Sequence, residues 1–423
     1  MNFKVLIISH NCFCNKKNNG KTLEALFSQF PKGCIAQLFF HMSDMPDWNF
    51  CNNYYRITDR DVAASFMHDS IGSELRKPSE CLGVVSHSSK TQYYHKLKSW
   101  FGDLGRDLIW TIGRWNSPHL KQWLNRFRPN IVFYVGGKAK FSADVALSIS
   151  TSLHIPLVSY YTDDYLLSIQ RDSIINKIEY RRVYKIISRI ILGSSATYVI
   201  GDYMAQEYAK VFNRQFTPIM NSVSLKEQSI YPQHKNLTIS YFGGLHLNRW
   251  KMIIRLSKLV PTNVHIDVYT SSNSINHQIE MEFKNNKINY RGSLSGEALN
   301  NAMANSDILL HVESDDEANR RFTKLAVSTK IPEYLISSRP ILGYGPKEVA
   351  SMRILSENGI GFVIGSDDED SLVESQIRKI CEDYNLRKDI SEKGYIYACS
   401  KFNREKTSTK LLQELTEIVN KNN

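Results

Sequence analysis

The sequence lacks several features that mark whole classes of protein. It contains no apolar run near the ~18 residues that a membrane-spanning helix needs, and its opening apolar stretch is too short for a signal peptide. We therefore expect a cytoplasmic protein. Its 7 cysteines are scattered and odd in number, and no pair has the spacing of a zinc or redox motif, so free thiols are expected.

Acidic residues are fewer than basic ones, 42 against 53, which leaves a net charge of +11. Residues 91–128 are basic and hold four of the 6 tryptophans, while residues 175–192 interleave basic and apolar residues at helical spacing. Both stretches suit an anionic membrane surface, where each basic residue contributes about 1 kcal/mol and tryptophan favours the interface. The alternative is buried tryptophans beside a solvated basic face. No nucleic-acid partner is expected, because no recognised binding module accompanies the charge.

A chain of 423 residues suggests two domains. Short β-rich runs alternate with helical stretches, which predicts α/β domains with parallel sheets. Strands are expected at 3–9, 35–40, 130–135, 155–161, 197–201, 217–220, 237–242, 264–270, 288–292, 307–312, 340–344 and 360–364. Residues 41–90 carry few periodic features and receive no assignment.

A polar, irregular stretch at 221–236 is the expected linker between the two domains. We place the first domain at 1–222 and the second at 223–402. The amphipathic helix predicted at 403–423 needs a surface on which to pack, and the first domain can supply it. Two open α/β domains in series would place a ligand cleft between the carboxyl ends of their sheets.

The loop after the first strand ends in Gly20-Lys21-Thr22, which is similar to the end of a phosphate-binding P-loop. The first glycine of that motif is replaced by Asn15, and six residues separate the strand end near Ser9 from this position. Three interpretations are open at this point. The loop belongs to a nucleoside triphosphatase, it is a solvated connection before a helix, or it faces the ligand of another nucleotide-binding fold.

Two stretches of the second half carry candidate anion-binding residues. In residues 239–252 a strand ends in Gly243-Gly244, with Arg249 and Lys251 a turn later. Glycines let backbone amides approach a phosphate closely, and the cations can neutralise it. The alternative is a tight turn with two surface cations.

Residues 311–345 form the other stretch. Glu313 ends a strand, Glu333 lies in the first turn of a short helix, and Lys330 precedes it by one turn on the same face. A carboxylate at a helix N-terminus is stabilised by up to ~1 kcal/mol without any ligand, which is the alternative to a role in binding.

The run "STKIPEYLISSRPILGYGP" resembles the K-x-x-E-[YF] signature of GT-B glycosyltransferases, especially the family 4-like enzymes (glycosyl transferases group 1) that use nucleotide-activated sugars. Four other segments are similar to the family's segments in the same order: "PNIVFYVGG", "SSATYVIGDYMAQEYAKVF", "PIMNSV" and "ISYFGGLHLNRW". The resemblance covers most of residues 130–400 and, more weakly, 1–40. It implies two Rossmann-like domains.

The resemblance also implies roles for the candidate residues. Glu333 matches the glutamate that binds the nucleotide's ribose, and Glu313 is the nearest match to a glutamate that contacts the donor sugar. Diphosphate-binding positions are matched by Arg249 and Lys330, with Lys251 a weaker candidate. Gly20 matches a loop that approaches the donor from the first domain. The sequence departs from the family at one point, because its two glutamates are twenty residues apart and Leu325 occupies the usual position of the first.

Asp163 and Asp164 follow a strand of the first domain, in a region that lines the acceptor side in the resembling family. A carboxylate there could act as a base in an inverting reaction or position the sugar in a retaining one. The alternative is a pair that caps the next turn. The pair is not a D-x-D metal motif. No metal or other cofactor is expected, because cationic side chains and helix N-termini can stabilise a leaving diphosphate.

These observations predict a cytoplasmic GT-B enzyme that transfers a sugar from a nucleotide-sugar donor to a hydroxyl of a saccharide acceptor, expected to be polyprenyl-linked. Its role would lie in cell-surface polysaccharide biosynthesis, with peripheral binding to the inner face of the membrane. The alternatives are a non-catalytic basic scaffold on the same fold, a sugar-nucleotide epimerase and a P-loop hydrolase.

Overall fold

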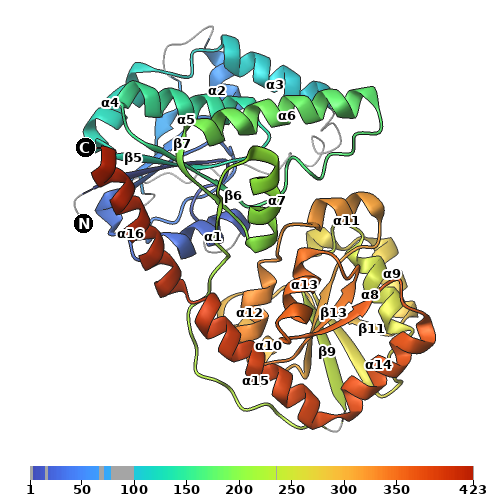
Figure 1. Ribbon diagram of the computed structural model, residues 1–423. Coiled ribbons are helices and arrows are strands. Elements are labelled where there is room, and N and C mark those ends of the chain that lie inside the picture. Colours follow the sequence, from blue (N-terminus) through green and yellow to red (C-terminus); the bar gives the residue numbers. More distant parts are fainter. Residues whose placement is uncertain (1–2, 15–17, 66–70, 78–99, 235, 423) are drawn as a thin grey trace. The chain divides into compact units, whose positions relative to one another are not determined.

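The computed structural model describes residues 3–14, 18–65, 71–77, 100–234 and 236–422. The chain forms two compact α/β units (Figure 1). Unit 1 comprises Met1–Ile219 and Ser408–Asn423, and unit 2 comprises Met220–Thr407. The sequence placed this boundary at 222/223. Within the described residues, no helix has the length and apolar character needed to cross a membrane.

The sheet of unit 1 has the strand order β4-β3-β2-β1-β5-β6-β7-β8. Every neighbouring pair is parallel except β3 and β4. Its central strands are almost continuously apolar because helices bury both faces of the sheet. The strands are β1 (Val5–Ser9), β2 (Ile35–Phe39), β3 (Tyr54–Arg56), β4 (Ser73–Glu74), β5 (Ile131–Val135), β6 (Leu157–Tyr161), β7 (Ser194–Val199) and β8 (Thr217–Pro218).

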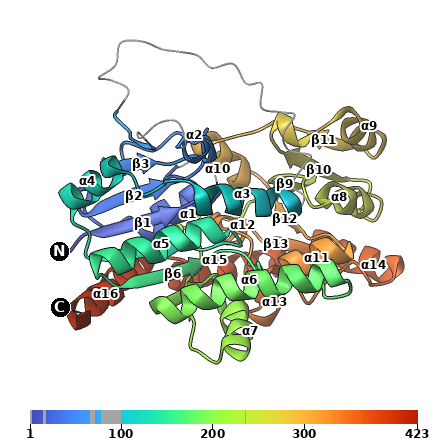
Figure 2. The ribbon, with the colours of Figure 1, turned by 90° about the horizontal axis from the view of Figure 1, so that it is seen from above.

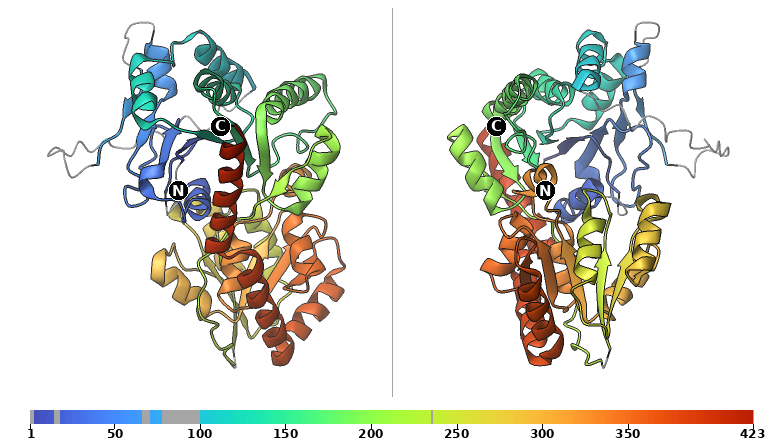
Figure 3. Two further views of the ribbon diagram at one scale, coloured as in Figure 1. Left: turned by 60° about the vertical axis from the view of Figure 1, so that its left-hand side comes forward. Right: turned by 90° about the vertical axis from the view of Figure 1, so that its right-hand side faces the viewer.

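Helices cover the two faces of this sheet in separate layers. α5 packs on β1, β5 and β6, and α6 packs on β6 and β7 (Figure 2). On the opposite face, α1 and α16 share a core with the sheet that includes Phe27, Phe133, Leu411 and Leu415 (Figure 3). The helices are α1 (Asn18–Leu26), α2 (Asp59–Ala64), α3 (Trp100–Ile112), α4 (Pro118–Phe127), α5 (Lys140–Leu153), α6 (Ile174–Gly193), α7 (Asp202–Phe212) and α16 (Arg404–Asn422).

The sheet of unit 2 is parallel throughout and has the order β11-β10-β9-β12-β13-β14. Its strands are β9 (Leu237–Phe242), β10 (Val264–Tyr269), β11 (Ile288–Tyr290), β12 (Ile308–Val312), β13 (Ile341–Gly345) and β14 (Phe362–Gly365). Its helices are α8 (Arg249–Ser257), α9 (His277–Asn285), α10 (Gly296–Ala304), α11 (Glu317–Thr323), α12 (Lys330–Ile336), α13 (Ala350–Glu357), α14 (Asp370–Glu382) and α15 (Tyr384–Lys401). All connections are βα crossovers, so the carboxyl ends of the strands share one edge.

The predicted α/β class with parallel sheets is confirmed, and each of the twelve predicted strands is present with ends shifted by up to three residues. Two strands were missed, β3 and β4, which lie in the unassigned segment 41–90. They have three and two residues, too few to show an alternating pattern. Of the two alternatives for the tryptophans, burial holds for Trp110 and Trp123.

We predict that Leu415→Ala destabilises unit 1 by about 2–5 kcal/mol, because it removes a fully buried side chain and leaves a cavity between α16 and the sheet. Chemical denaturation followed by tryptophan fluorescence would measure the loss. Gln413→Ala on the exposed side of the same helix should change stability by less than about 0.5 kcal/mol. Equal stability of the two variants would show that α16 does not contribute to the core of unit 1.

Candidate functional site

Most of the predicted donor-binding residues gather at the carboxyl ends of two adjacent strands in unit 2. β9 is followed by Gly243 and Gly244, and after a short loop Arg249 begins α8. β12 pairs directly with β9 and is followed by Glu313. Ligands of open α/β sheets bind at this edge. The sheet therefore brings together residues that are 64 positions apart in the sequence.

A buried ion pair forms the centre of this group. Arg249 Nη2 lies 3.2 Å from Glu313 Oε2 and 3.4 Å from Oε1, and the two side chains are 15% and 2% exposed. His311 Nε2 lies 3.1 Å from Oε1 of the same carboxylate. Burial alone would raise the pKa of Glu313, but Arg249 and His311 outweigh it and lower the pKa below its ordinary value. Glu313 is therefore ionised at neutral pH.

The ion pair also shifts the pKa values of Arg249 itself and of the neighbouring His246. Burial opposes the charge of Arg249, but the carboxylate of Glu313 raises the pKa of Arg249 overall. His246 Nε2 lies 3.3 Å from Arg249 Nη1, and burial together with the charge of Arg249 lowers the pKa of His246. At neutral pH the group thus combines a cation, an anion and an imidazole whose protonation is disfavoured.

The loop between β9 and α8 is tightly constrained. A Cβ at Gly244 would lie 2.6 Å from the His246 ring, so a larger residue here would displace that ring. The Gly243 N–H donates to Tyr269 O and extends the sheet; this amide is not available to an anion. Leu247 and Asn248 adopt φ values of 59° and 58°, a conformation that costs an ordinary residue about 1–2 kcal/mol. Strain of this kind concentrates at functional sites.

The short helix α12 supplies the other predicted pair. Lys330 Nζ donates to Glu333 Oε2 at 2.8 Å, and both side chains are partly or largely buried. The next residue ties the helix to β9, because Tyr334 Oη accepts from Phe242 N at 2.9 Å and donates to Phe242 O at 3.1 Å. α12 is therefore held against the strand that leads into the glycine loop.

Lys251 does not join this group. It lies two residues after Arg249 on α8, which turns its side chain about 200° away. Lys251 is exposed, and its Nζ lies 5.6 Å from the Trp250 ring centre.

The long spacing between Glu313 and Glu333 has a structural explanation, since α11 lies between them. Leu325, which follows α11, is buried.

The two aspartates predicted in unit 1 follow β6. Asp164 is buried, and its Oδ1 accepts from Leu166 N, Leu167 N and Tyr208 Oη at 2.8–3.1 Å. Burial raises the pKa of Asp164, although these hydrogen bonds oppose the shift. Asp163 is partly exposed, and its Oδ2 accepts from Thr162 and Tyr165. The contacts of Asp164 favour a structural role, while its predicted catalytic role and that of Asp163 stay predictions.

Gly20 lies in the first turn of α1 and not in an open loop. A Cβ at this position would lie 2.6 Å from Cys12 O and 2.7 Å from Cys14 N, so the glycine allows the helix to pack on the preceding chain. The expected contact of Gly20 with a donor therefore stays a prediction. Asn15, the other end of the P-loop comparison, lies outside the described residues.

One member of the buried group, His311, was not predicted from the sequence. His311 is two residues before Glu313 at the end of β12, and residues i and i+2 of a strand share a face. A histidine and a glutamate at this spacing in an otherwise apolar strand are the signal that could have identified it. Within the described ranges, no three His, Cys, Asp or Glu side chains are arranged to hold a metal ion.

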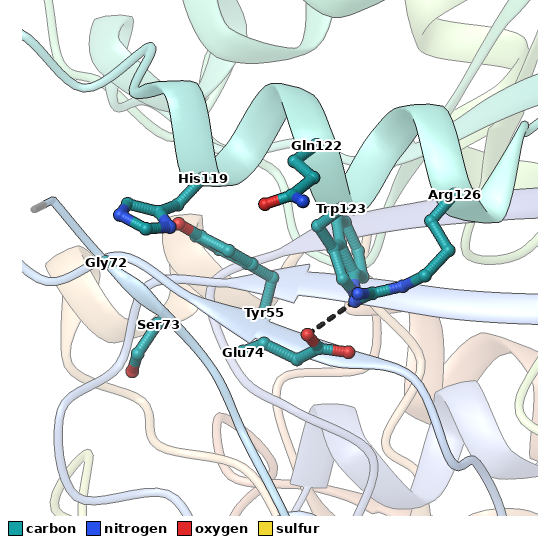
Figure 4. A pocket seen from close by; sticks show the side chains of 8 residues that line it. All are labelled: Tyr55, Gly72, Ser73, Glu74, His119, Gln122, Trp123 and Arg126. Atoms are coloured by element: carbon teal, nitrogen blue, oxygen red, sulfur yellow. Dashed lines mark hydrogen bonds and ion pairs between the residues drawn. The ribbon is translucent and has the colours of Figure 1, made fainter.

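A pocket of about 260 Å³ lies elsewhere, between α4 and the edge strands of unit 1 (Figure 4). Tyr55 and Trp123 are buried beneath it, and an ion pair between Glu74 and Arg126 crosses one end. His119 and Gln122 of α4 also line it. The pocket contains none of the residues that the sequence analysis selected.

No protein-family model matches the sequence, and no curated protein matches it. Solved structures, however, match nearly the whole chain. HepE from Anabaena, in complex with UDP-glucose, is 12% identical, with 98% of this chain and 100% of that chain covered and a TM-score of 0.62. Sucrose-phosphate synthase from Thermosynechococcus elongatus is 10% identical, with 98% and 99% covered and a TM-score of 0.66.

A third structure, WaaG, is described as a glycosyltransferase involved in lipopolysaccharide biosynthesis. It is 12% identical, with 96% and 99% covered and a TM-score of 0.57. At these identities the likeness concerns the fold. It confirms the predicted GT-B fold with two Rossmann-like units.

The buried ion pair predicts a specific dependence of stability on pH. Because folding lowers the pKa of Glu313, its contribution is present above the ordinary glutamate value of about 4.3 and is lost as the pH falls through the folded value. Glu313→Gln should destabilise unit 2 by about 3–5 kcal/mol at pH 7, since Arg249 is left buried without its partner. The difference from the wild type should shrink on acidification towards pH 3.

Urea denaturation at several pH values would measure this difference. Glu297→Gln on α10, at an exposed position, is the matched control and should follow the wild type at every pH. If the difference in unfolding free energy between Glu313→Gln and the wild type stayed constant from pH 7 to pH 3, Glu313 would not be an ionised, paired carboxylate.

Proposed function

We propose that this chain is a glycosyltransferase that transfers a sugar from a nucleotide-sugar donor to a hydroxyl of a saccharide acceptor. The observation that carries the proposal is the convergence of Arg249, Glu313, Lys330 and Glu333 on the carboxyl edge of the unit 2 sheet. This edge is where α/β sheets of this kind bind nucleotides. Among the structures that share the fold, HepE was solved with UDP-glucose.

The donor's diphosphate would be held by Arg249 and Lys330. Both cations have a carboxylate partner, but neither is saturated by it, because a guanidinium has five N–H donors and an ammonium has three. Each can keep its protein partner and bond a phosphate oxygen as well. The charge on these groups would stabilise the leaving diphosphate, a role that requires no metal or other cofactor.

The two glutamates would bind hydroxyl groups. Carboxylates only accept hydrogen bonds when ionised, and the pKa of Glu313 is lowered by Arg249 and His311 despite burial. Glu333 would accept from the ribose hydroxyls, while Glu313 would accept from hydroxyls of the donor sugar. Gly244 adds one more group, since its N–H forms no hydrogen bond with the described part of the chain. That amide could bond a phosphate oxygen.

The acceptor would be a polyprenyl-linked saccharide in cell-surface polysaccharide biosynthesis, used at the cytoplasmic face of the membrane. This part of the proposal draws on the surface of α6. Ile174, Ile175 and Ile178 are 77%, 60% and 45% exposed at its N-terminal end. Lys177 and Arg181 are exposed on the same outward face, because residues three and four apart are neighbours on a helix.

The cations of α6 divide into two groups. Arg182 pairs with Asp107 and Glu179, and Arg189 pairs with Asp144. Lys177, Arg181 and Lys185 form no ion pair with any residue that the structure describes. Three such charges could contribute about 3 kcal/mol beside an anionic bilayer, and the exposed isoleucines could insert among the headgroups.

The donor site is tested by Glu333→Ala. Nucleoside-diphosphate binding should weaken roughly 10²-fold, because each hydrogen bond to a charged group contributes about 1.5–3 kcal/mol, and sugar transfer should be lost. A thermal-shift screen with UDP, GDP, ADP and their sugars would measure binding, and product formation would measure transfer. Glu374→Gln, on the exposed side of α14, is the control. If Glu333→Ala transfers sugar at the wild-type rate, Glu333 is not part of the site.

The membrane surface is tested by the triple variant Lys177→Glu, Arg181→Glu and Lys185→Glu. We expect the wild type to sediment with phosphatidylglycerol vesicles at low salt and to be released at high salt, because charges at a surface are screened. The triple variant should remain in the supernatant. Lys258→Glu, Lys284→Glu and Lys287→Glu, at exposed positions of unit 2, give a control of equal charge change. Equal binding of the wild type to neutral vesicles would contradict the proposal.

A further inference from the structure

Two histidines meet at the carboxyl edge of the unit 1 sheet, where the adjacent parallel strands β1 and β2 end. His10 follows β1 and His41 lies two residues after β2. Their rings are in edge-to-face contact, with centres 5.4 Å apart. The backbone holds the two loops together as well, because His10 O accepts from Phe40 N at 3.2 Å and from His41 N at 3.0 Å.

A buried carboxylate orients the second histidine. His41 Nδ1 lies 3.0 Å from Asp44 Oδ1, and the two side chains are 38% and 7% exposed. Asn11 Nδ2 donates to the other oxygen of Asp44 at 2.8 Å, which fixes the carboxylate in place. A carboxylate beside Nδ1 selects the tautomer with its proton on Nδ1. Nε2 then carries a lone pair that can accept a hydrogen bond.

The backbone beneath this pair is rigid. Gln37 of β2 is fully buried, and its Nε2 donates to Ser9 Oγ at 2.8 Å and to Asn11 O at 3.2 Å. Its Oε1 accepts from Phe13 N at 2.8 Å. The last residue of β1 and two residues of the loop after it are thus bonded to a single side chain of the neighbouring strand. A site held in this way binds a ligand with little loss of conformational entropy.

Two ion pairs and a further cation lie near the two histidines. Burial of the ring, with the charge of Arg106 as a further cause, lowers the pKa of His10 to about 4 although part of the residue is exposed. Arg106 itself pairs with Asp59 at 2.8 Å, and His41 pairs with Asp44. The further cation is Arg56, whose Nη1 donates to Met42 O at 3.0 Å.

We propose that the His41–Asp44 pair, with His10 beside it, is a binding site for a hydroxyl of the acceptor saccharide. His41 Nε2 accepts the hydrogen bond of that hydroxyl and directs its oxygen, Asp44 positions the ring of His41, and His10 bonds a second hydroxyl. The inference rests on the proposed function, because it supplies the acceptor site that a glycosyltransferase needs. The sequence analysis had placed acceptor binding near Asp163 and Asp164.

The hydrogen-bonding groups of the site suit a polyol. Two adjacent imidazoles offer one donor and one acceptor each in the neutral form, which matches the dual character of hydroxyl groups. Met42 and Met45 follow His41 in the sequence and are 53% and 71% exposed. Flexible thioether side chains of this kind adapt to apolar surfaces, such as the C–H face of a sugar ring.

Histidine side-chain NMR tests the proposal directly. The full-length protein, labelled with ¹⁵N-histidine, would be titrated with octyl α- and β-hexosides of glucose, galactose, mannose and N-acetylglucosamine. At least one should shift the Nε2 resonance of His41 in a saturable manner. His41→Ala should weaken binding of that hexoside by about tenfold, the loss expected for one hydrogen bond.

Asp44→Asn should change the ¹⁵N resonances that report the tautomer of His41, and it should also weaken hexoside binding. The control is His119→Ala, at an exposed histidine of α4, which should change neither the His41 resonances nor the affinity. In a transfer assay, His41→Ala should raise the KM for the hexoside, whereas the control His119→Ala should leave that KM unchanged. The proposal is overturned if no hexoside shifts His41, or if His41→Ala binds as tightly as the wild type. Hexoside binding at His41 without any transfer would overturn the proposed function and leave this site standing.

Discussion

The ion pair between Arg249 and Glu313 is the constraint on which the donor end of unit 2 depends. An ionised carboxylate with 2% exposure costs several kcal/mol unless a cation and other polar groups compensate it. Arg249 supplies the charge and His311 a second close contact. Arg249 reaches Glu313 because the loop after β9 makes a sharp turn through two residues with positive φ. The same turn positions the start of α8 and the amide of Gly244.

The two units treat charge differently at equivalent edges of their sheets. Unit 2 places two cations, Arg249 and Lys330, beside two carboxylates, and both cations keep donors that a phosphate can use. Unit 1 places His41 against Asp44 and Arg106 against Asp59. The proposed donor site therefore relies on cations with further N–H donors, whereas the proposed acceptor site relies on two imidazoles that can each donate and accept.

Much of the architecture could be predicted because the sheets are almost entirely parallel and their central strands are buried. Their strands stand out as apolar runs between helical segments, and twelve of them were located in this way. β3 and β4 were missed, since strands of three and two residues in a segment with few periodic features carry too little pattern. The candidate site was predicted in part. Local patterns singled out Glu333 and Lys330, and the pair does form. Lys251 was grouped with Arg249, but its place on the helix turns it away, while His311 was hidden within an apolar strand.

The sequence by itself determined the α/β class, the alternation of strands and helices and the chemical types of the candidate residues, because these follow from short-range patterns of polarity and backbone preference. Only the tertiary structure decided which residues share a site. Arg249 meets Glu313 across 64 positions, and Asn11 meets Asp44 across 33, through strand pairings that no local pattern encodes. Burial was also decided there: the helix that carries Trp110 turns it into the core, whereas α6 leaves Ile174 in solvent. The physical reason is that packing acts between segments distant in sequence, and it sets the environment of each side chain.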